Sequence, residues 1–311
     1  MIKPDLSVEL GQIQLQNPII TASGTCGFGE ELEDYIDVNK LGALTVKGLT
    51  LEASEGNSTP RIAETASGLL NAIGLENPGL EGFINNKLEI IDNYNIPVFV
   101  NISGHSVDDF AIMAEKLASY REIAALEINV SCPNIAGGGM VFGTDRELLY
   151  KVVKKVRSNY GGPLIIKLSP NVTDIVEMTK VAEEAGADII SLINTLLGMS
   201  IDIKEKKPVL ANTFGGLSGP AIKPVALRMV YQVASEIDLP LIGMGGIMTG
   251  EDAIEFILAG ASAVGIGTAT LIDPEACKRI LREMEDYMLE NKIEDLSQLR
   301  GKAIQPACID R

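Results

Sequence analysis

The sequence lacks the features that mark several large classes of protein. Its four cysteines, Cys26, Cys132, Cys277 and Cys308, lie far apart and form no C-x-x-C pair. We therefore expect no metal or iron–sulfur site on this chain alone, and a reducing cytoplasm as its location. No apolar run approaches the length of about 20 residues that a helix needs to span a bilayer. The first residues show neither a signal peptide nor a lipidation motif, so we expect no membrane contact.

Basic residues are also scarce. The chain has 26 Lys and Arg against 42 Asp and Glu, which gives a formal net charge of −16. A basic surface for a nucleic-acid backbone is therefore not expected. The hydrophobic content of 46% and charged content of 22% are typical of a soluble globular protein. A chain of 311 residues is long enough for two domains or for one barrel.

Histidine, the most frequent general base, occurs once. His105 lies several residues beyond the end of a predicted strand, next to Ser106, which we expect to cap a helix. The general base of any enzyme reaction is therefore sought elsewhere.

What the chain does contain is a repeated alternation of short apolar runs and amphipathic segments. Runs that are apolar at nearly every position are typical of parallel strands covered on both faces. Eight of them predict a single (β/α)₈ TIM barrel of the α/β class over residues 1–311. The alternative is a doubly wound open sheet, but no G-x-G-x-x-G motif follows the first run. The eight runs are Pro18–Ala22, Ala43–Val46, Val98–Ile102, Ala125–Val130, Leu164–Leu168, Ile189–Ile193, Leu241–Met244 and Ala263–Ile266.

Two elaborations and several helix ends are also predicted. Weak alternation over Leu6–Gln16 indicates a small N-terminal hairpin, and Leu49–Leu80 is a long insertion after the second strand. Thr249 and Asp252 have the spacing of an acidic capping box, while Gly186 supplies a left-handed helix stop.

The predicted strand ends carry polar residues or glycine. In a TIM barrel these ends meet at one mouth, where active sites lie. A lysine inside a buried strand needs a partner, so Lys167 should face an anion or a ligand, or else pair internally with Glu127. Lys47 has a second interpretation as a Schiff-base nucleophile of an aldolase-like barrel. The residues at the strand ends are Ser23, Lys47, Asn101, Asn129, Lys167, Asn194, Gly243 and Gly265.

Glycine-rich segments follow the last two predicted strands, at Gly243–Ile247 and Gly265–Ala269. Backbone N–H groups in such segments bind phosphate in many TIM barrels. Gly215–Gly219 adds a third such loop.

Cys132 is the candidate reacting side chain. It follows the fourth strand, lies between Asn129 and Asn134, and precedes the glycine-rich flap Gly137–Gly139. A free thiol in a cytosolic protein is usually inert packing, but a thiol at a strand end beneath a glycine-rich flap is typical of an active site.

These segments together resemble the class 1 dihydroorotate dehydrogenases over nearly the whole chain. The resemblance depends on the motifs N-P-I-I-T-A-S-G, T-V-K-G-L-T, N-A-I-G-L-E-N-P-G, N-V-S-C-P-N, I-I-K-L-S-P, N-T-F-G-G-L-S-G, G-M-G-G-I and G-I-G-T-A, in that order. It implies one FMN per chain and the oxidation of dihydroorotate to orotate in pyrimidine biosynthesis. A hydride would pass to the flavin N5 and the C5 proton to Cys132. The resemblance implies substrate contacts from Lys47, Asn71, Ala72, Ile73, Gly74, Leu75, Asn129, Asn194 and Thr195. It implies FMN contacts from Ser23, Lys47, Gly48, Asn101, Asn129, Lys167, Ile193, Gly219, Gly245, Gly246, Gly267 and Thr268.

The motifs also favour one branch of that family. A cysteine base and the absence of an amphipathic N-terminal extension resemble the soluble class, and G-T-C-G-F-G-E-E resembles its NAD-linked type. This type works with a second subunit that holds FAD and a [2Fe–2S] cluster, in a heterotetramer built on a homodimer. The alternatives are the fumarate-linked type and a flavin barrel that reduces uracil in tRNA, which the net charge disfavours.

Overall fold

The computed structural model describes residues 3–131 and 142–305. Eight parallel strands form one sheet in the order β3-β16-β15-β10-β9-β8-β7-β4, and the bridge between Ile20 and Ala43 joins its two edges. The predicted TIM barrel is therefore confirmed, and the open-sheet alternative is wrong. All eight predicted runs are barrel strands, with ends that differ by at most a residue or two. The strands are β3 Ile19–Thr21, β4 Leu44–Thr45, β7 Val98–Ile102, β8 Ala125–Asn129, β9 Leu164–Lys167, β10 Ile189–Leu192, β15 Leu241–Met244 and β16 Ala263–Ile266.

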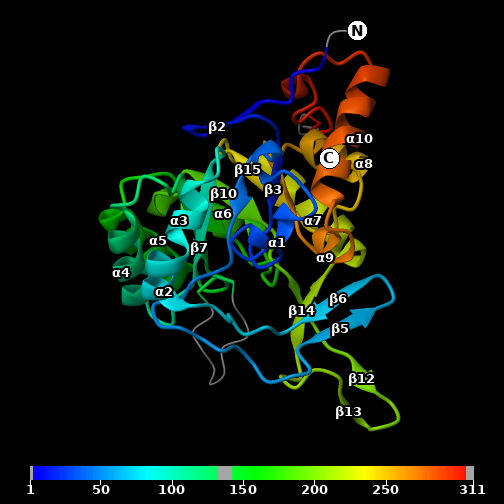
Figure 1. Ribbon diagram of the computed structural model, residues 1–311. Helices are drawn as coiled ribbons and strands as arrows, with labels where there is room; N and C mark the ends of the chain where they lie inside the picture. The colour runs from blue at the N-terminus through cyan, green and yellow to red at the C-terminus, as the bar shows by residue number, and fades with distance from the viewer. Residues whose placement is uncertain (1–2, 132–141, 306–311) are drawn as a thin grey trace, which may run out of the picture.

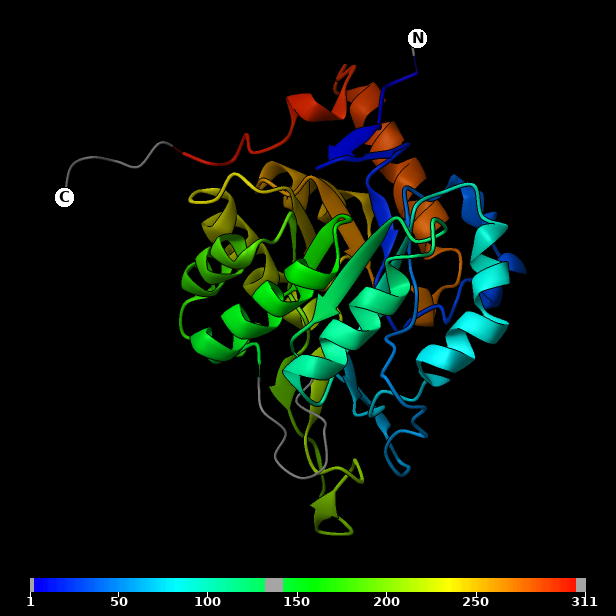
Figure 2. The same cartoon turned by 90° about the vertical axis from the view of Figure 1, so that its left-hand side faces the viewer.

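Helices surround this barrel (Figures 1 and 2). The predicted capping box of Thr249 and Asp252 begins α8, and Gly186 ends α6 in the left-handed conformation, as expected. Ser106 caps α4 through a second capping box. The helices are α1 Glu30–Glu33, α2 Gly79–Asn86, α3 Leu88–Asp92, α4 Val107–Leu117, α5 Arg146–Asn159, α6 Ile175–Ala185, α7 Lys223–Ala234, α8 Gly250–Leu258, α9 Thr268–Ile272 and α10 Ala276–Glu290, with 3₁₀ turns at Val38–Lys40, Pro220–Ile222 and Leu296–Gln298.

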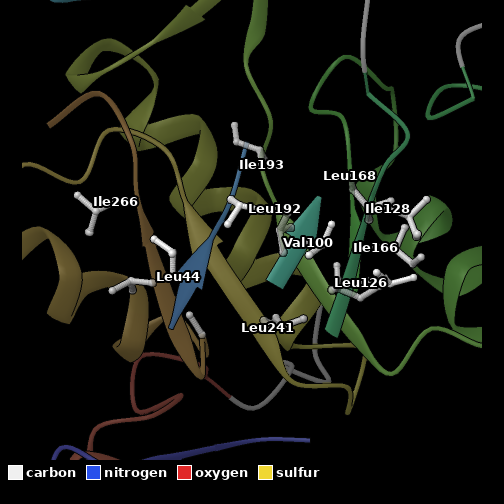
Figure 3. Packing of buried hydrophobic residues seen from close by; sticks show 14 of the residues in the cluster. Leu44, Val100, Leu126, Ile128, Ile166, Leu168, Leu192, Ile193, Leu241 and Ile266 are labelled. Carbon is white, nitrogen blue, oxygen red and sulfur yellow. The ribbon is translucent and has the colours of Figure 1, made fainter. Parts of the chain in front are cut away.

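Strand side chains alternate between two cores. Those that point outward, such as Leu126, Ile128 and Ile166, join the large cluster beneath the helices (Figure 3). Those that point inward, such as Phe99 and Ile165, form a smaller cluster inside the barrel. This alternation explains why the strands read as continuous apolar runs, because both faces are buried.

The predicted N-terminal hairpin closes one end of the barrel. Strands β1 Val8–Leu10 and β2 Ile13–Leu15 pair antiparallel. Leu10, Ile13 and Leu15 belong to the interior cluster, so the hairpin covers the amino-terminal ends of the barrel strands. The opposite end is therefore left for a ligand.

A four-stranded antiparallel sheet lies beyond that opposite end, at the bottom of Figure 1. Two strands, β5 Ile62–Thr65 and β6 Gly68–Asn71, come from the predicted insertion. The other two, β11 Leu196–Gly198 and β14 Gly215–Ser218, follow β10 and were not predicted as strands. Between them β12 Ile201–Asp202 and β13 Lys207–Pro208 form a projecting hairpin.

Candidate active site

A cavity of about 380 Å³ lies at the carboxyl ends of the barrel strands, within the range of ligand pockets. Its wall also includes the antiparallel sheet, through residues such as Ile62 and Leu69. The structure thus brings together side chains from segments that are up to about 250 residues apart in the sequence. The predicted site residues that line this cavity are Ser23, Lys47, Gly48, Asn71, Ile73, Gly74, Leu75, Asn101, Asn129, Lys167, Ile193, Asn194, Thr195, Gly219, Gly245, Gly246, Gly265, Gly267 and Thr268.

Some predicted residues are placed elsewhere. Ala72 is fully buried in a small cluster with Leu70, away from the cavity. Gly243, expected at the barrel mouth, instead faces Phe256 of α8, where an added Cβ would lie 2.7 Å from the ring, so this expectation is wrong. His105 is exposed and does not line the cavity. Cys132 and the flap Gly137–Gly139 lie outside the described residues.

Lys167 is held in the cavity wall by partners on two sides. Its side chain is 5% exposed, and Nζ donates a hydrogen bond to Ser23 Oγ at 3.1 Å. Nζ also lies 3.6 Å from Glu127 Oε2. The internal ion pair, one of the two alternatives for Lys167, is therefore present, and Lys167 also lines the cavity. Its contact with a ligand stays a prediction.

Asn101 has one unsatisfied atom. Its Nδ2 donates to Glu127 Oε2 at 2.6 Å, while its Oδ1 is buried and has no hydrogen-bond partner among the described residues. Asn101 lines the cavity, and its Oδ1 lies 2.7 Å from the position that a Cβ at Gly48 would take. A buried acceptor in this position is suited to a ligand that donates a hydrogen bond.

Two asparagines form a linked pair on another part of the wall. Asn194 Nδ2 donates to Asn129 Oδ1 at 3.2 Å, and the same oxygen accepts from the backbone N–H of Ser131. The Asn194 Oδ1 accepts from the N–H of Thr195 at 2.8 Å. These contacts fix both amides. Asn129 lines the cavity, and its Nδ2 donates to no acceptor among residues 3–131 and 142–305, so it is suited to a ligand that accepts a hydrogen bond.

The insertion contributes a loop with an unusual backbone. Gly74 and Leu75 both have positive φ, at 78° and 56°. Asn77 holds this turn, because its Nδ2 donates to Leu75 O at 2.6 Å and to Thr50 Oγ1 at 2.7 Å. Asn77 was not predicted as a site residue. Its position in N-A-I-G-L-E-N, two residues after the turn, is the only sequence signal that it gives.

Three glycine loops meet on the remaining side of the cavity. Gly219, Gly245 and Gly246 have φ of 92°, 130° and 77°, which other residues rarely adopt. A Cβ at Gly246 would lie 2.7 Å from Gly219 O, so the loops pack too closely for a side chain. Thr268 Oγ1 donates to Ser218 Oγ at 2.8 Å beside them. Backbone N–H groups and hydroxyls arranged in this way suit a phosphate group.

The fold and the cavity define a class of TIM-barrel protein with a ligand-sized pocket at the carboxyl ends of its strands, lined by glycine loops on one side and by amide and ammonium groups on the other. The family model of dihydroorotate dehydrogenase matches residues 5–288. The chain belongs to the dihydroorotate dehydrogenase family, as its resemblance implied.

Relatives in this family are similar over their full length. The chain is 55% identical over 304 residues to the dihydroorotate dehydrogenase B (NAD(+)), catalytic subunit, of Geotalea uraniireducens, covering 98% of this chain and 100% of that one. It is 52% identical over 301 residues to the protein of the same name from Alkaliphilus metalliredigens, covering 97% and 99%.

A solved structure is similar in fold. The dihydroorotate dehydrogenase of Eimeria tenella, in complex with ferulenol, superposes with a TM-score of 0.82 at 22% identity, covering 97% of this chain and 89% of that one. Within residues 3–131 and 142–305, no helix combines the length and the apolar character that crossing a bilayer requires.

Proposed function

We propose that this chain is the catalytic subunit of an NAD-linked dihydroorotate dehydrogenase, which oxidises dihydroorotate to orotate in pyrimidine biosynthesis with FMN as its cofactor. The observation that carries the proposal is the cavity at the carboxyl ends of the strands, in which a buried cation, linked asparagines and tightly packed glycine loops lie together.

The residues on the cavity wall fit FMN. Gly219, Gly246 and Gly267 would hold its phosphate, since no side chain obstructs their backbone N–H groups. Lys167 would lie beside the flavin ring as a fixed positive charge, and Asn101 Oδ1 would accept a hydrogen bond from it. When bound, FMN supplies the hydride acceptor for the reaction.

Dihydroorotate would occupy the space between the asparagines and the insertion. Its carboxylate requires a cation or amide donors, which Lys47, Asn71 and Asn194 supply from the wall. Its pyrimidine edges both donate and accept hydrogen bonds, as amide side chains do. The turn at Gly74 and Leu75 would close on the ring from the insertion side.

Oxidation also removes a proton from C5 of the substrate, which requires a base in the chain. We assign this role to Cys132. The preceding residue, Ser131, lines the cavity, and its Oγ donates to the Lys167 carbonyl at 3.0 Å. The chain at this point is therefore tied to the cavity wall, and the assignment of Cys132 itself depends on sequence.

Electrons would leave through another chain. The relatives are named catalytic subunits, and this sequence has no cysteine spacing for an iron–sulfur cluster. The partner we infer holds FAD and a [2Fe–2S] cluster, and the assembly is a heterotetramer built on a homodimer.

Replacement of the base tests the mechanism. Cys132→Ala should retain FMN but slow its reduction by dihydroorotate by a factor of about 10² to 10⁴, because a positioned general base contributes that much. The measurement is the decay of visible flavin absorbance after anaerobic mixing in a stopped-flow instrument.

Two controls separate this effect from a damaged fold. Cys26→Ala removes a buried thiol outside the cavity and should leave the reduction rate within about twofold of the wild type. Dithionite should reduce FMN equally in all three proteins. A Cys132→Ala enzyme that reduces its FMN at the wild-type rate would remove this residue from the mechanism.

A further inference from the structure

A buried carboxylate lies behind the cavity wall. Glu127 belongs to β8, and its side chain is 2% exposed inside the barrel. It does not line the cavity. From the sequence it was expected only as a possible ion-pair partner for Lys167. A carboxylate in such a place must be paired and hydrogen-bonded, since burial of an isolated charge is costly.

Three other strands of the barrel, β7, β9 and β10, supply those partners. Asn101 of β7 donates from Nδ2 to Glu127 Oε2 at 2.6 Å. Ser191 of β10 donates from Oγ to Glu127 Oε1 at 2.8 Å. Lys167 of β9 places Nζ 3.6 Å from Oε2, which is too long for a good hydrogen bond but close for two opposite charges.

This arrangement determines what the cavity wall presents. Because a carboxylate only accepts hydrogen bonds, Asn101 must turn its Nδ2 toward Glu127 and its unpaired Oδ1 away from it. The ammonium of Lys167 has three donors, of which one reaches Ser23 Oγ. Glu127 is therefore behind both groups that would contact the flavin ring.

We propose that Glu127 is a positioning residue that orients Asn101 and partly offsets the charge of Lys167, and so sets how strongly the site favours reduced over oxidised FMN. The inference rests on the proposed function. Reduced flavin carries more negative charge than oxidised flavin, so Lys167 stabilises the reduced form and Glu127 opposes it. A purely structural ion pair would affect folding but not this preference, and buried pairs are in general weak contributors to stability.

The decisive variant is Glu127→Gln, which keeps the side-chain shape. Its amide oxygen still accepts from Asn101, and its amide nitrogen donates to the Ser191 hydroxyl. Loss of the negative charge should increase the ratio of the FMN dissociation constants, oxidised over reduced, by about tenfold or more. For a two-electron couple, tenfold corresponds to a midpoint potential about 30 mV more positive. The potential of the FMN-loaded protein is measured anaerobically against a reference dye.

Two further variants keep the result interpretable. Ser191→Ala removes a hydrogen bond from the same carboxylate without changing its charge, and should leave the potential near that of the wild type. Glu127→Asp keeps the charge but draws it back from Lys167 by one methylene group, and should raise the potential by less than Glu127→Gln does. If Glu127→Gln does not fold, the Asp variant carries the test.

The outcomes distinguish this inference from the proposed function. A potential that rises in Glu127→Gln or Glu127→Asp, but not in Ser191→Ala, supports it. An unchanged or lowered potential in a variant that binds FMN and is still reduced by dihydroorotate overturns the role of Glu127 and leaves the proposed function standing. A wild-type chain that binds no FMN overturns both.

Discussion

At the scale of single residues, the side chains inside the barrel change from apolar to polar within two positions along β7, β8 and β9. Phe99, Ala125 and Ile165 are apolar and fill the part of the interior next to the N-terminal hairpin. Asn101 and Lys167, two residues further along their strands, are polar. Alternate residues of a strand face the same side, so the next inward-facing residue toward the carboxyl end belongs to the cavity wall instead of the core. The site is thus built directly on the core, and its side chains have little freedom to move.

Buried thiols give the chain a response to alkaline pH. Burial raises the pKa of Cys26 to about 11, and it also raises the pKa of Cys277. A raised pKa in the folded state means that the native protein retains the proton longer than the unfolded chain does. The resulting stability is present below the unfolded pKa of 9.0 and is lost as pH rises toward about 11.

We therefore expect the free energy of unfolding to fall between pH 9 and 11, by about 2–3 kcal/mol through Cys26 alone. In Cys26→Ala the decline should be shallower, with the remainder due to Cys277 and to buried Tyr160, because burial raises the pKa of both groups. Urea unfolding at several pH values measures the slope. A slope that is identical in wild type and variant would show that Cys26 does not titrate in this way.

At the scale of elements, helix caps anchor the loops that surround the site. Thr249 Oγ1 accepts from the N–H of Asp252 at 3.2 Å, and Asp252 Oδ2 accepts from Thr249 N at 3.0 Å and Met248 N at 2.8 Å. This capping box begins α8 three residues after Gly246. It therefore fixes the far end of the predicted phosphate loop.

Thr249→Ala should lower the free energy of unfolding by about 1 kcal/mol, the usual effect of losing such a cap. Thr173→Ala is a matched control, because Thr173 is exposed and Asp174, rather than Thr173, caps α6. It should change stability by less than about 0.5 kcal/mol. Equal effects in the two variants would mean that the capping box adds nothing beyond an ordinary surface threonine.

The sequence predicted elements well where local patterning determines them. The eight strands are buried on both faces, so their apolar runs stand out, and the caps of α4, α6 and α8 have characteristic residues. Strands β11 and β14 have no such pattern, since they are short. β11 pairs with β14, and β14 in turn pairs with β6, which lies far away in the sequence. Asn71 Nδ2, for example, donates to Gly216 O across 145 positions.

Prediction of the site was similarly uneven. Asn129, Lys167 and Asn194 were found because polar residues at strand ends face the mouth of a barrel. The same rule failed at Gly243, since whether a residue at a strand end points inward or outward depends on register. Ala72 was included because its neighbours were, although it directly follows β6 and is buried in a cluster with Leu70 and Leu210.

At the scale of the whole molecule, the N-terminal hairpin closes one end of the barrel and the cavity lies at the other end. The N-terminal hairpin covers the amino-terminal ends of the strands, and the antiparallel sheet extends from the carboxyl ends (Figure 1). The cavity therefore lies at the end of the barrel that the hairpin does not cover.

We expect the isolated chain to pass electrons from dihydroorotate to NAD poorly, because nothing in its sequence predicts a dinucleotide site. Addition of the partner subunit should restore the activity. Steady-state NADH formation with and without the partner measures this, and an artificial dye acceptor serves as the control for an intact active site. Full NAD activity from the single chain would contradict the predicted partner.

The most direct test of the central claim is anaerobic titration of the FMN-loaded chain with dihydroorotate. The account predicts that the flavin absorbance bleaches and that one orotate forms for each FMN reduced. A protein that binds FMN but remains oxidised in excess dihydroorotate, while dithionite still reduces it, would contradict the account.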